Sequence, residues 1–117
     1  MRYILLIHGD EHAWDAMSDA ERGEQYERYG KLQREMEEHG HYVAGDEIGP
    51  AASGKVLRVR GGDTVVTDGP FAETKEQFGG YFVVECDEQT ALDYAAKIPA
   101  AEGGSIEIRT IVEGPGG

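Results

Sequence analysis

The sequence is poor in cysteine, basic residues and long apolar runs, and each shortage excludes a class of protein. Its one cysteine, Cys86, rules out an internal disulfide, a two-cysteine redox motif and a multi-cysteine zinc site within one chain. The apolar run at residues 3–7 is shorter than a signal-peptide core, and no segment reaches membrane-spanning length. We therefore expect a cytoplasmic protein with no membrane partner.

Basic residues are also outnumbered, because 11 lysines and arginines stand against 23 aspartates and glutamates, for a formal net charge of −12. This charge repels phosphate backbones, so nucleic acid is not expected as a direct partner. Charges of both signs are interleaved, which indicates a solvated surface. The 117 residues suffice for one domain, predicted over residues 1–112, with a flexible C-terminal tail at residues 113–117.

Two helices are predicted from their ends and their apolar spacing. Ser18 to Glu21 has the form of a capping box, and Gly40 stands where a left-handed C-terminal cap is expected. The apolar stripe between them consists of Tyr26, Tyr29, Leu32 and Met36. Asp87 is suited to cap the second helix, which Pro99 ends.

The remaining β-rich segments predict a sheet and a hairpin. Strands are expected over residues 3–7, 41–48, 55–60, 64–67, 81–85 and 105–109. The third and fourth form a hairpin around Gly61 and Gly62. The order of elements predicts an α+β fold, a ferredoxin-like split β-α-β arrangement with an added hairpin. Since two helices cover only one face of such a sheet, we expect a second copy to cover the other in a homodimer.

One stretch carries a family resemblance. Residues 68–82 read DGPFAETKEQFGGYF, which resembles the signature of the YCII-related domain family, in the branch named for DGPFAETKE. Segments 3–11, 43–45 and 103–105 are similar to that family as well, so the resemblance covers nearly the whole chain. It implies a ferredoxin-like subunit that forms a dimeric α+β barrel, with a cleft between the sheet and the surrounding loops.

The resemblance also implies classes of function. Related families of this architecture include cofactor-free isomerases and lyases of aromatic breakdown, so no cofactor is expected. Members of this branch occur with alternative sigma factors, which implies a regulatory setting. The better-described branch uses a helical histidine with an aspartate as an acid-base pair. Tyr26 stands in the place of that histidine here, so the pair does not carry over.

The residues of the signature have a chemistry of their own. Asp68 or Glu73 could act as a general base in a partly desolvated cleft, and Lys75 could stabilise a developing enolate or carboxylate. Phe71 supplies an apolar cover, and His8, at the end of the first strand, is a further acid-base candidate. The alternative is a rigid connector in which Asp68 only caps a turn.

Other polar residues are weaker candidates. Arg58 and Arg109 could each grip a ligand carboxylate if their strand faces look into the barrel, and are ordinary outward residues if not. Tyr26 is expected in the core or in a pocket wall. The segment at residues 8–12, HGDEH, holds potential metal ligands, but we expect a loop there and therefore no metal site.

Two functions from different classes remain open. The first is a cofactor-independent enzyme of the lyase or isomerase type that acts on a small polar or aromatic acid. The second is a non-catalytic ligand-binding or regulatory module linked to sigma-factor-dependent transcription. Clustering of the acid-base candidates around a water-poor pocket would favour the first, and a shallow, hydrated site would favour the second.

Overall fold

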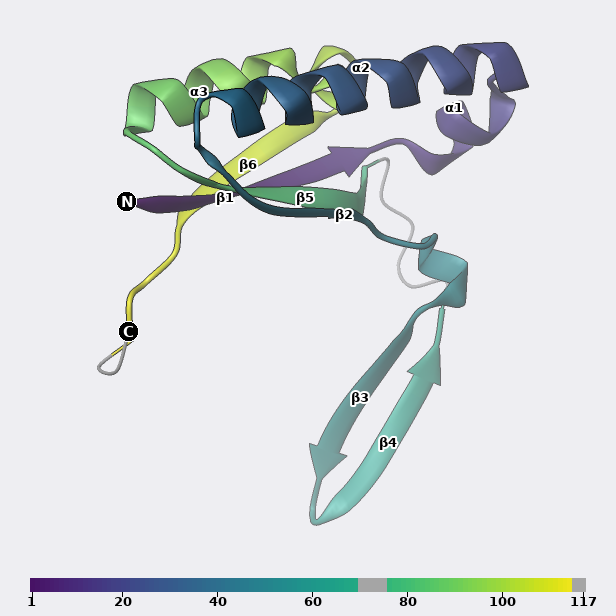
Figure 1. Ribbon diagram of the computed structural model, residues 1–117. Helices are drawn as coiled ribbons and strands as arrows, with labels where there is room; N and C mark the ends of the chain where they lie inside the picture. Colours follow the sequence, from purple (N-terminus) through teal and green to yellow (C-terminus); the bar gives the residue numbers. More distant parts are fainter. Residues whose placement is uncertain (70–75, 115–117) are drawn as a thin grey trace.

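A four-stranded antiparallel sheet forms the body of the protein in the computed structural model, which describes residues 1–69 and 76–114 (Figure 1). Its strands are β1 (Arg2–Gly9), β2 (Tyr42–Glu47), β5 (Gln77–Glu85) and β6 (Ser105–Thr110), in the order β2-β5-β1-β6. This order, with helices after the first and third of these strands, agrees with the predicted ferredoxin-like α+β arrangement. Phe71, Glu73 and Lys75 lie outside the described residues.

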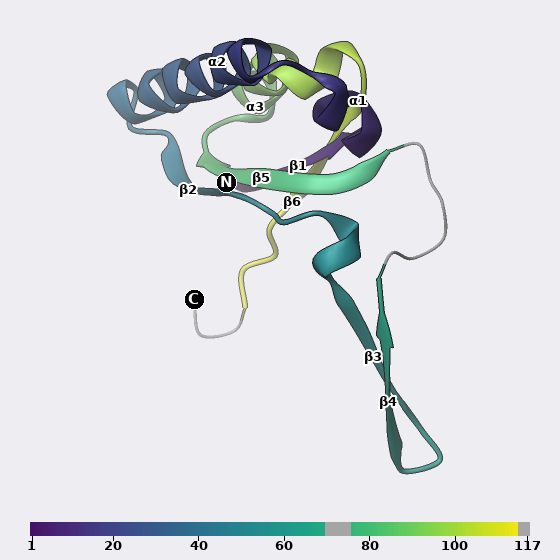
Figure 2. The same cartoon turned by 90° about the vertical axis from the view of Figure 1, so that its right-hand side faces the viewer.

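Helices cover one face of this sheet. The elements are α1 (Glu11–Ala16), α2 (Asp19–Glu38) and α3 (Glu88–Lys97), with short 3₁₀ turns η1 (Ala51–Ser53) and η2 (Pro99–Glu102). Helices α2 and α3 lie side by side across the sheet, as two views agree (Figures 1 and 2). None of the helices in the described part of the chain is long and apolar enough to cross a membrane.

The core lies between these helices and the sheet. Leu5, Val84, Met36 and Ile98 are fully buried and come from β1, β5, α2 and the end of α3. Their strands contribute every second residue, because successive side chains of a strand point to opposite faces. One face of the sheet is therefore packed, and the residues between the core positions lie on the other.

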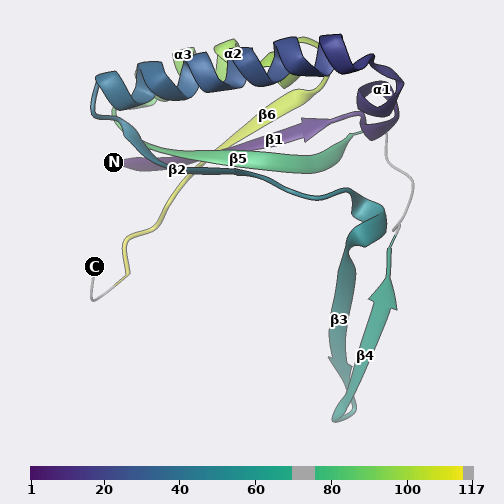
Figure 3. The same cartoon turned by 45° about the vertical axis from the view of Figure 1, so that its right-hand side comes forward.

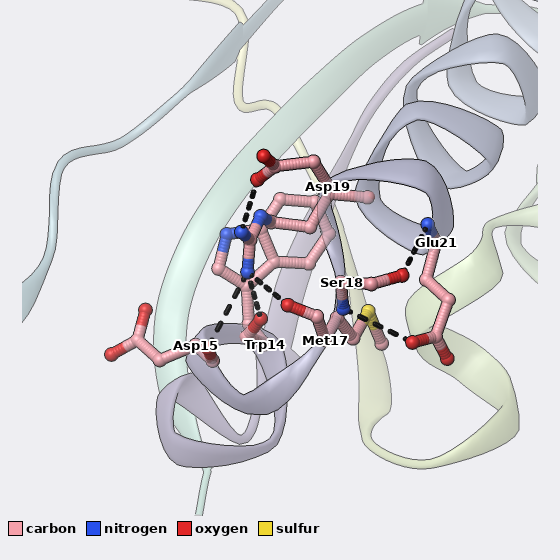
Figure 4. Close-up of polar contacts among 7 residues, drawn as sticks. Trp14, Asp15, Met17, Ser18, Asp19 and Glu21 are labelled. Atoms are coloured by element: carbon pink, nitrogen blue, oxygen red, sulfur yellow. Dashed lines mark hydrogen bonds and ion pairs between the residues drawn. The ribbon is translucent and has the colours of Figure 1, made fainter.

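The ends of the helices follow the sequence signals. Ser18 caps α2 in a full capping box, in which its Oγ accepts from the Glu21 amide at 3.1 Å and the Glu21 carboxylate accepts from the Ser18 amide at 3.0 Å (Figure 4). Gly40 has a φ of +71° after α2. Asp87 caps α3 by accepting from the Thr90 amide at 2.7 Å. Both predicted helices are confirmed.

Helix α1 corrects the expectation of a loop after β1. Asp10 caps it by accepting from the amides of His12 and Ala13. The guanidinium of Arg22, in α2, donates to the carbonyls of Trp14 at 3.1 Å and Met17 at 2.6 Å, and so satisfies the end of α1. The sequence pattern missed α1 because this six-residue helix buries no side chain and so has no apolar stripe.

The predicted hairpin is confirmed as a separate two-stranded sheet of β3 (Lys55–Arg60) and β4 (Asp63–Asp68). Gly61 and Gly62 make its turn with φ values of +58° and +85°, which favour glycine. Figure 3 shows that the hairpin points away from the body, on the side opposite the helices. We call residues 55–68 the arm.

Candidate functional site on the open sheet face

The sheet has a face without helices, which we call the open face. Tyr3, Leu5 and Ile7 of β1 are in the core, so the alternate residues of that strand point the other way. On β5 and β6, Phe82 and Ile108 point toward the core, so the residues next to them in sequence point to the open face. The open face therefore carries Ile4, Leu6, His8, Tyr81, Val83, Glu107 and Arg109.

An imidazole and a carboxylate meet on this face. His8 Nε2 lies 3.2 Å from Glu107 Oε1, although the two residues are 99 positions apart in the sequence. The strand register brings them together, because Glu107 is paired with Leu6 and the neighbouring Ser105 with His8. The ring of Phe78, paired with His8 from β5, lies 5.9 Å from the imidazole. The pair thus has an acid-base group, a charged partner and an aromatic wall.

A guanidinium borders the pair. Arg109 Nη1 lies 4.0 Å from Glu107 Oε2, and its side chain is 69% exposed. Arg109 is opposite Ile4, so it lies one same-face position beyond Glu107 and two beyond the imidazole along the sheet. Exposure leaves its planar donors accessible to a carboxylate from solution. Of the two predicted arginines, this one lies on the same face as His8.

A second hydrogen-bonded carboxylate lies across the open face. The Tyr81 hydroxyl donates to Asp46 Oδ2 at 2.7 Å, between β5 and β2. This hydrogen bond raises the pKa of Tyr81 above its usual range. Leu6 lies between Tyr81 and Glu107 in the strand pairing, so the two carboxylates are separated by an apolar side chain. Polar side chains of Asp46, Tyr81 and Glu107 thus lie in a row across the open face, with the apolar side chains of Ile4 and Val83 at the next positions along the strands.

The start of the signature stretch lies at the base of the arm. Asp68 Oδ1 accepts from Lys55 Nζ at 2.5 Å, in an exposed ion pair. The Gly69 amide donates to the Gly54 carbonyl at 2.9 Å, and a Cβ on Gly69 would lie 2.1 Å from the Ala51 carbonyl oxygen. In the described part of the chain, Asp68 closes the hairpin and has no hydrogen bond to His8.

Arg58 and Tyr26 lie elsewhere. Arg58 is an exposed residue of β3, in the arm. Tyr26 was expected in the core or in a pocket wall, and it is 50% exposed on α2. Its hydroxyl donates to Glu47 at 2.8 Å, which raises the pKa of Tyr26, and its ring meets Trp14 edge-on. Tyr26 is therefore outside the core, and of the two expected places it has the second, in the wall of a shallow groove along α2.

The acidic residues after β1 have structural partners. Asp10 caps α1, and Glu11 Oε1 accepts from the Ala51 amide at 2.9 Å, which ties the start of α1 to the loop before the arm. Within residues 1–69 and 76–114, no three potential ligands are grouped as a metal site would need.

Comparison with known proteins gives the family. The model of the YCII-related domain matches residues 1–114. The chain belongs to the YCII-related domain family. It is also 34% identical over 114 residues to an uncharacterized protein of Rhizobium meliloti (strain 1021), a similarity that covers 95% of this chain and 92% of the relative.

Sequence reasoning missed part of the site in this YCII-related domain. Glu107, Tyr81 and Asp46 were not singled out as site residues, because each belongs to an ordinary strand pattern. The parity of the strands was the available signal: His8 and Leu6 share a face, and Glu107 is polar between Ile106 and Ile108. Parity identifies the face, but only the register identifies the partners.

Proposed function

We propose that the open face of this YCII-related domain binds a small carboxylic acid and that His8 and Glu107 act on it as an acid-base pair, without a cofactor. The observation that carries the proposal is the 3.2 Å contact between His8 Nε2 and Glu107 Oε1 on that face. Imidazole can accept and release a proton in general acid-base catalysis, and a neighbouring carboxylate orients its ring.

The neighbouring residues fit a substrate of this class. Arg109 presents an exposed guanidinium that suits a bidentate contact with a carboxylate. Phe78 and the apolar side chains Ile4 and Val83 suit an aliphatic or aromatic body. Proton transfer at the carbon next to a carbonyl, as in isomerases and lyases, needs a base at that carbon and a held carboxylate.

The same proposal includes a homodimer. Ile4, Leu6 and Val83 place apolar surface on a face that helices do not cover (Figure 1). Two sheets pack face to face at about 10 Å, so a second copy would close the open face and exclude water from the pair. Asp68, Phe71, Glu73 and Lys75 remain predicted site residues, which we propose to border the resulting chamber.

A measurement of proton exchange tests the catalytic part. Wild-type protein is incubated in D2O with pyruvate, 2-oxoglutarate and phenylpyruvate, and NMR follows deuterium incorporation at C3 of each acid. We expect incorporation with one of them, and a loss of about 100-fold or more in His8→Ala. Arg109→Ala should raise the concentration of acid needed for half-maximal rate.

Glu85→Gln is the matched control. Glu85 is an exposed carboxylate of the same sheet, held by Arg2 at 3.3 Å at the end remote from His8, so its loss should leave exchange unchanged. An equal effect of Glu85→Gln and His8→Ala would contradict a specific acid-base pair.

A binding module without catalysis is the second candidate. The exposure of the Glu107 and Arg109 side chains, 50% and 69%, favours it, because hydrated groups are weak acid-base catalysts. Its signature would be amide shifts of residues 105–110 on addition of the same acids, lost in Arg109→Ala, with no deuterium incorporation. The sigma-factor setting implied by the resemblance stays a prediction.

A further inference from the structure

The arm exposes more apolar surface than a hairpin in water normally does. Leu57, Val59, Val65 and Val66 are 61%, 58%, 47% and 52% exposed. Leu57 is paired directly with Val66, and Val59 follows Leu57 on the same face, so three of them form one apolar surface. An isolated two-stranded hairpin is only marginally stable in water, so this surface needs a partner.

The described body does not supply that partner. Strands β3 and β4 pair only with each other, and every residue of β4 is exposed. All three ribbon views show the arm standing off the sheet (Figures 1, 2 and 3). The radius of gyration is 16.4 Å, whereas a compact chain of this length has about 13 Å.

Hydrogen bonds and an ion pair hold the base of the arm. The Gly69 amide donates to the Gly54 carbonyl, and the Lys55 ammonium contacts Asp68 where the two strands leave the body. Glu11 holds the Ala51 amide just before β3. The first two contacts close the base of the hairpin, and the third ties the segment before β3 to α1 of the body.

A shallow groove of suitable chemistry lies at the opposite end of the body. Its volume is about 570 Å³, and its lining includes Tyr3, Glu88, Leu92, Ile108, Thr110 and Val112. Leu92 and Val112 are 43% and 87% exposed there. Tyr3, Ile108 and Leu92 place this groove on the helix side of the edge strand β6, and Arg109, from the open face, lines it as well.

The distances allow the arm of one subunit to reach the groove of another. Figure 1 shows the arm leaving the sheet at the end where β1 finishes, while β6 finishes and α3 begins at the other end. A two-fold rotation that stacks two open faces can place these ends opposite each other. Strands of six residues span about 20 Å, twice the spacing of about 10 Å between stacked sheets.

Charge favours the same pairing. Between residues 55 and 68 the arm has three basic residues against two acidic ones, in a chain whose formal net charge is −12. Its basic residues Lys55, Arg58 and Arg60 are all exposed, and Arg58 and Arg60 lie on the face opposite Leu57 and Val59. The arm is therefore repelled less by an acidic second copy than an average segment of this chain would be.

From these observations we propose that the arm docks its Leu57–Val66 surface in the groove of a second copy, at Leu92 and Val112, so that two arms clasp the dimer. This inference rests on the homodimer of the proposed function and adds the surface that holds it. It is independent of any ligand, so it is tested on the free protein.

The first test is the mass of the particle in solution. Wild-type chain should be a dimer by light scattering and sedimentation at micromolar concentration. Leu57→Asp with Val66→Asp should weaken dimerisation by about 100-fold or more, since it buries two charges without partners. The circular dichroism should not change, because both side chains are exposed in the subunit. Val65→Asp is the matched control, because Val65 is an exposed valine of the same arm that is paired with Arg58, on the face opposite Leu57 and Val66.

The second test identifies which surfaces meet. In a Cys86→Ser background, a Leu57→Cys chain and a Val112→Cys chain are mixed and oxidised. We expect the covalent heterodimer in preference to either homodimer, and little product when Glu24→Cys, at an exposed position of α2, replaces Leu57→Cys. The proposed docking of the arm would be contradicted by a monomeric wild type, by a dimer that the two aspartates do not weaken, or by crosslinking only between equal chains. Deuterium exchange in His8→Ala tests only the acid-base function, because this substitution should leave the mass of the particle in solution unchanged.

Discussion

The body and the arm contain the same kinds of residue, but their apolar side chains are buried in the body and exposed in the arm. In the body, Leu5 and Val84 are fully buried under helices, whereas Leu57 and Val66 in the arm are more than half exposed. Both pairs are aliphatic residues of antiparallel strands. The difference teaches that the arm's apolar side chains have no helix to pack against within their own subunit, so their contribution depends on another copy.

The largest effect should come from truncation of the body's core. Leu5→Ala should lower the free energy of unfolding by about 2–5 kcal/mol, because it opens a cavity at a fully buried site. Urea unfolding at several protein concentrations measures it, and the difference from wild type should not depend on concentration. Leu57→Ala should cost stability only at concentrations where the dimer forms. If Leu57→Ala also lowers the free energy of unfolding of the dilute monomer, the proposed difference between the body and the arm is contradicted.

Crowding at a glycine of the body should have the next effect. A Cβ on Gly104 would lie 2.1 Å from the His8 carbonyl oxygen, so Gly104→Ala must shift the backbone where β1 meets the β6 turn. We expect a loss of about 1–3 kcal/mol in thermal or urea unfolding. Gly103→Ala is the control, since nothing lies within 4 Å of its Cβ position. Equal losses for both would show that the close approach is not the cause.

Loss of the α2 cap should have a smaller effect. Ser18→Ala removes the oxygen that accepts from the Glu21 amide, and should lower the unfolding free energy by about 1 kcal/mol. Ser53→Ala, near the arm, should change it by less than about 0.5 kcal/mol, because Ser53 lies in an exposed turn. Denaturant titration of both variants compares the regions again, and a larger loss at Ser53 would reverse the expected order.

Acid should weaken the helix caps gradually. Hydrogen bonds from Thr90 lower the pKa of Asp87, and those with Ser18 lower the pKa of Glu21. Both carboxylates have folded pKa values below their unfolded ones, so their stabilisation is complete above the unfolded values and is lost as the pH falls through the folded ones. Unfolding curves between pH 7 and pH 3 should show the decline below about pH 4.5. Asp87→Asn with Glu21→Gln should flatten it, and an unchanged slope would exclude these caps as its source.

The sequence predicted local features well and the site only in part. The cap at Ser18, the buried Leu32 and Met36, and the turn at Gly61 were all readable, since each depends on neighbours within a few positions. Helix α1 was not, because it buries no side chain and therefore has no apolar stripe in the sequence. The choice between core and pocket wall for Tyr26 was also not readable, since periodicity does not show where a helix leaves the sheet.

The candidate site shows the same limit. His8 and Arg109 were named from their positions in strands, and strand parity was enough to place them on faces. The partnership of His8 with Glu107 depends on the antiparallel register of β1 with β6, across 99 positions of the chain. No spacing in the sequence encodes that register directly.

The sequence by itself determined the charge, the lack of disulfide chemistry, the helix ends, the hairpin turn and the family to which its signature stretch pointed. These follow from composition and from contacts between residues close along the chain. The tertiary structure alone decided that β1 lies between β5 and β6, that Glu107 meets His8, and that the arm stands free of its own body. Such features depend on long-range packing, in which residues remote in the chain compete for the same buried surface.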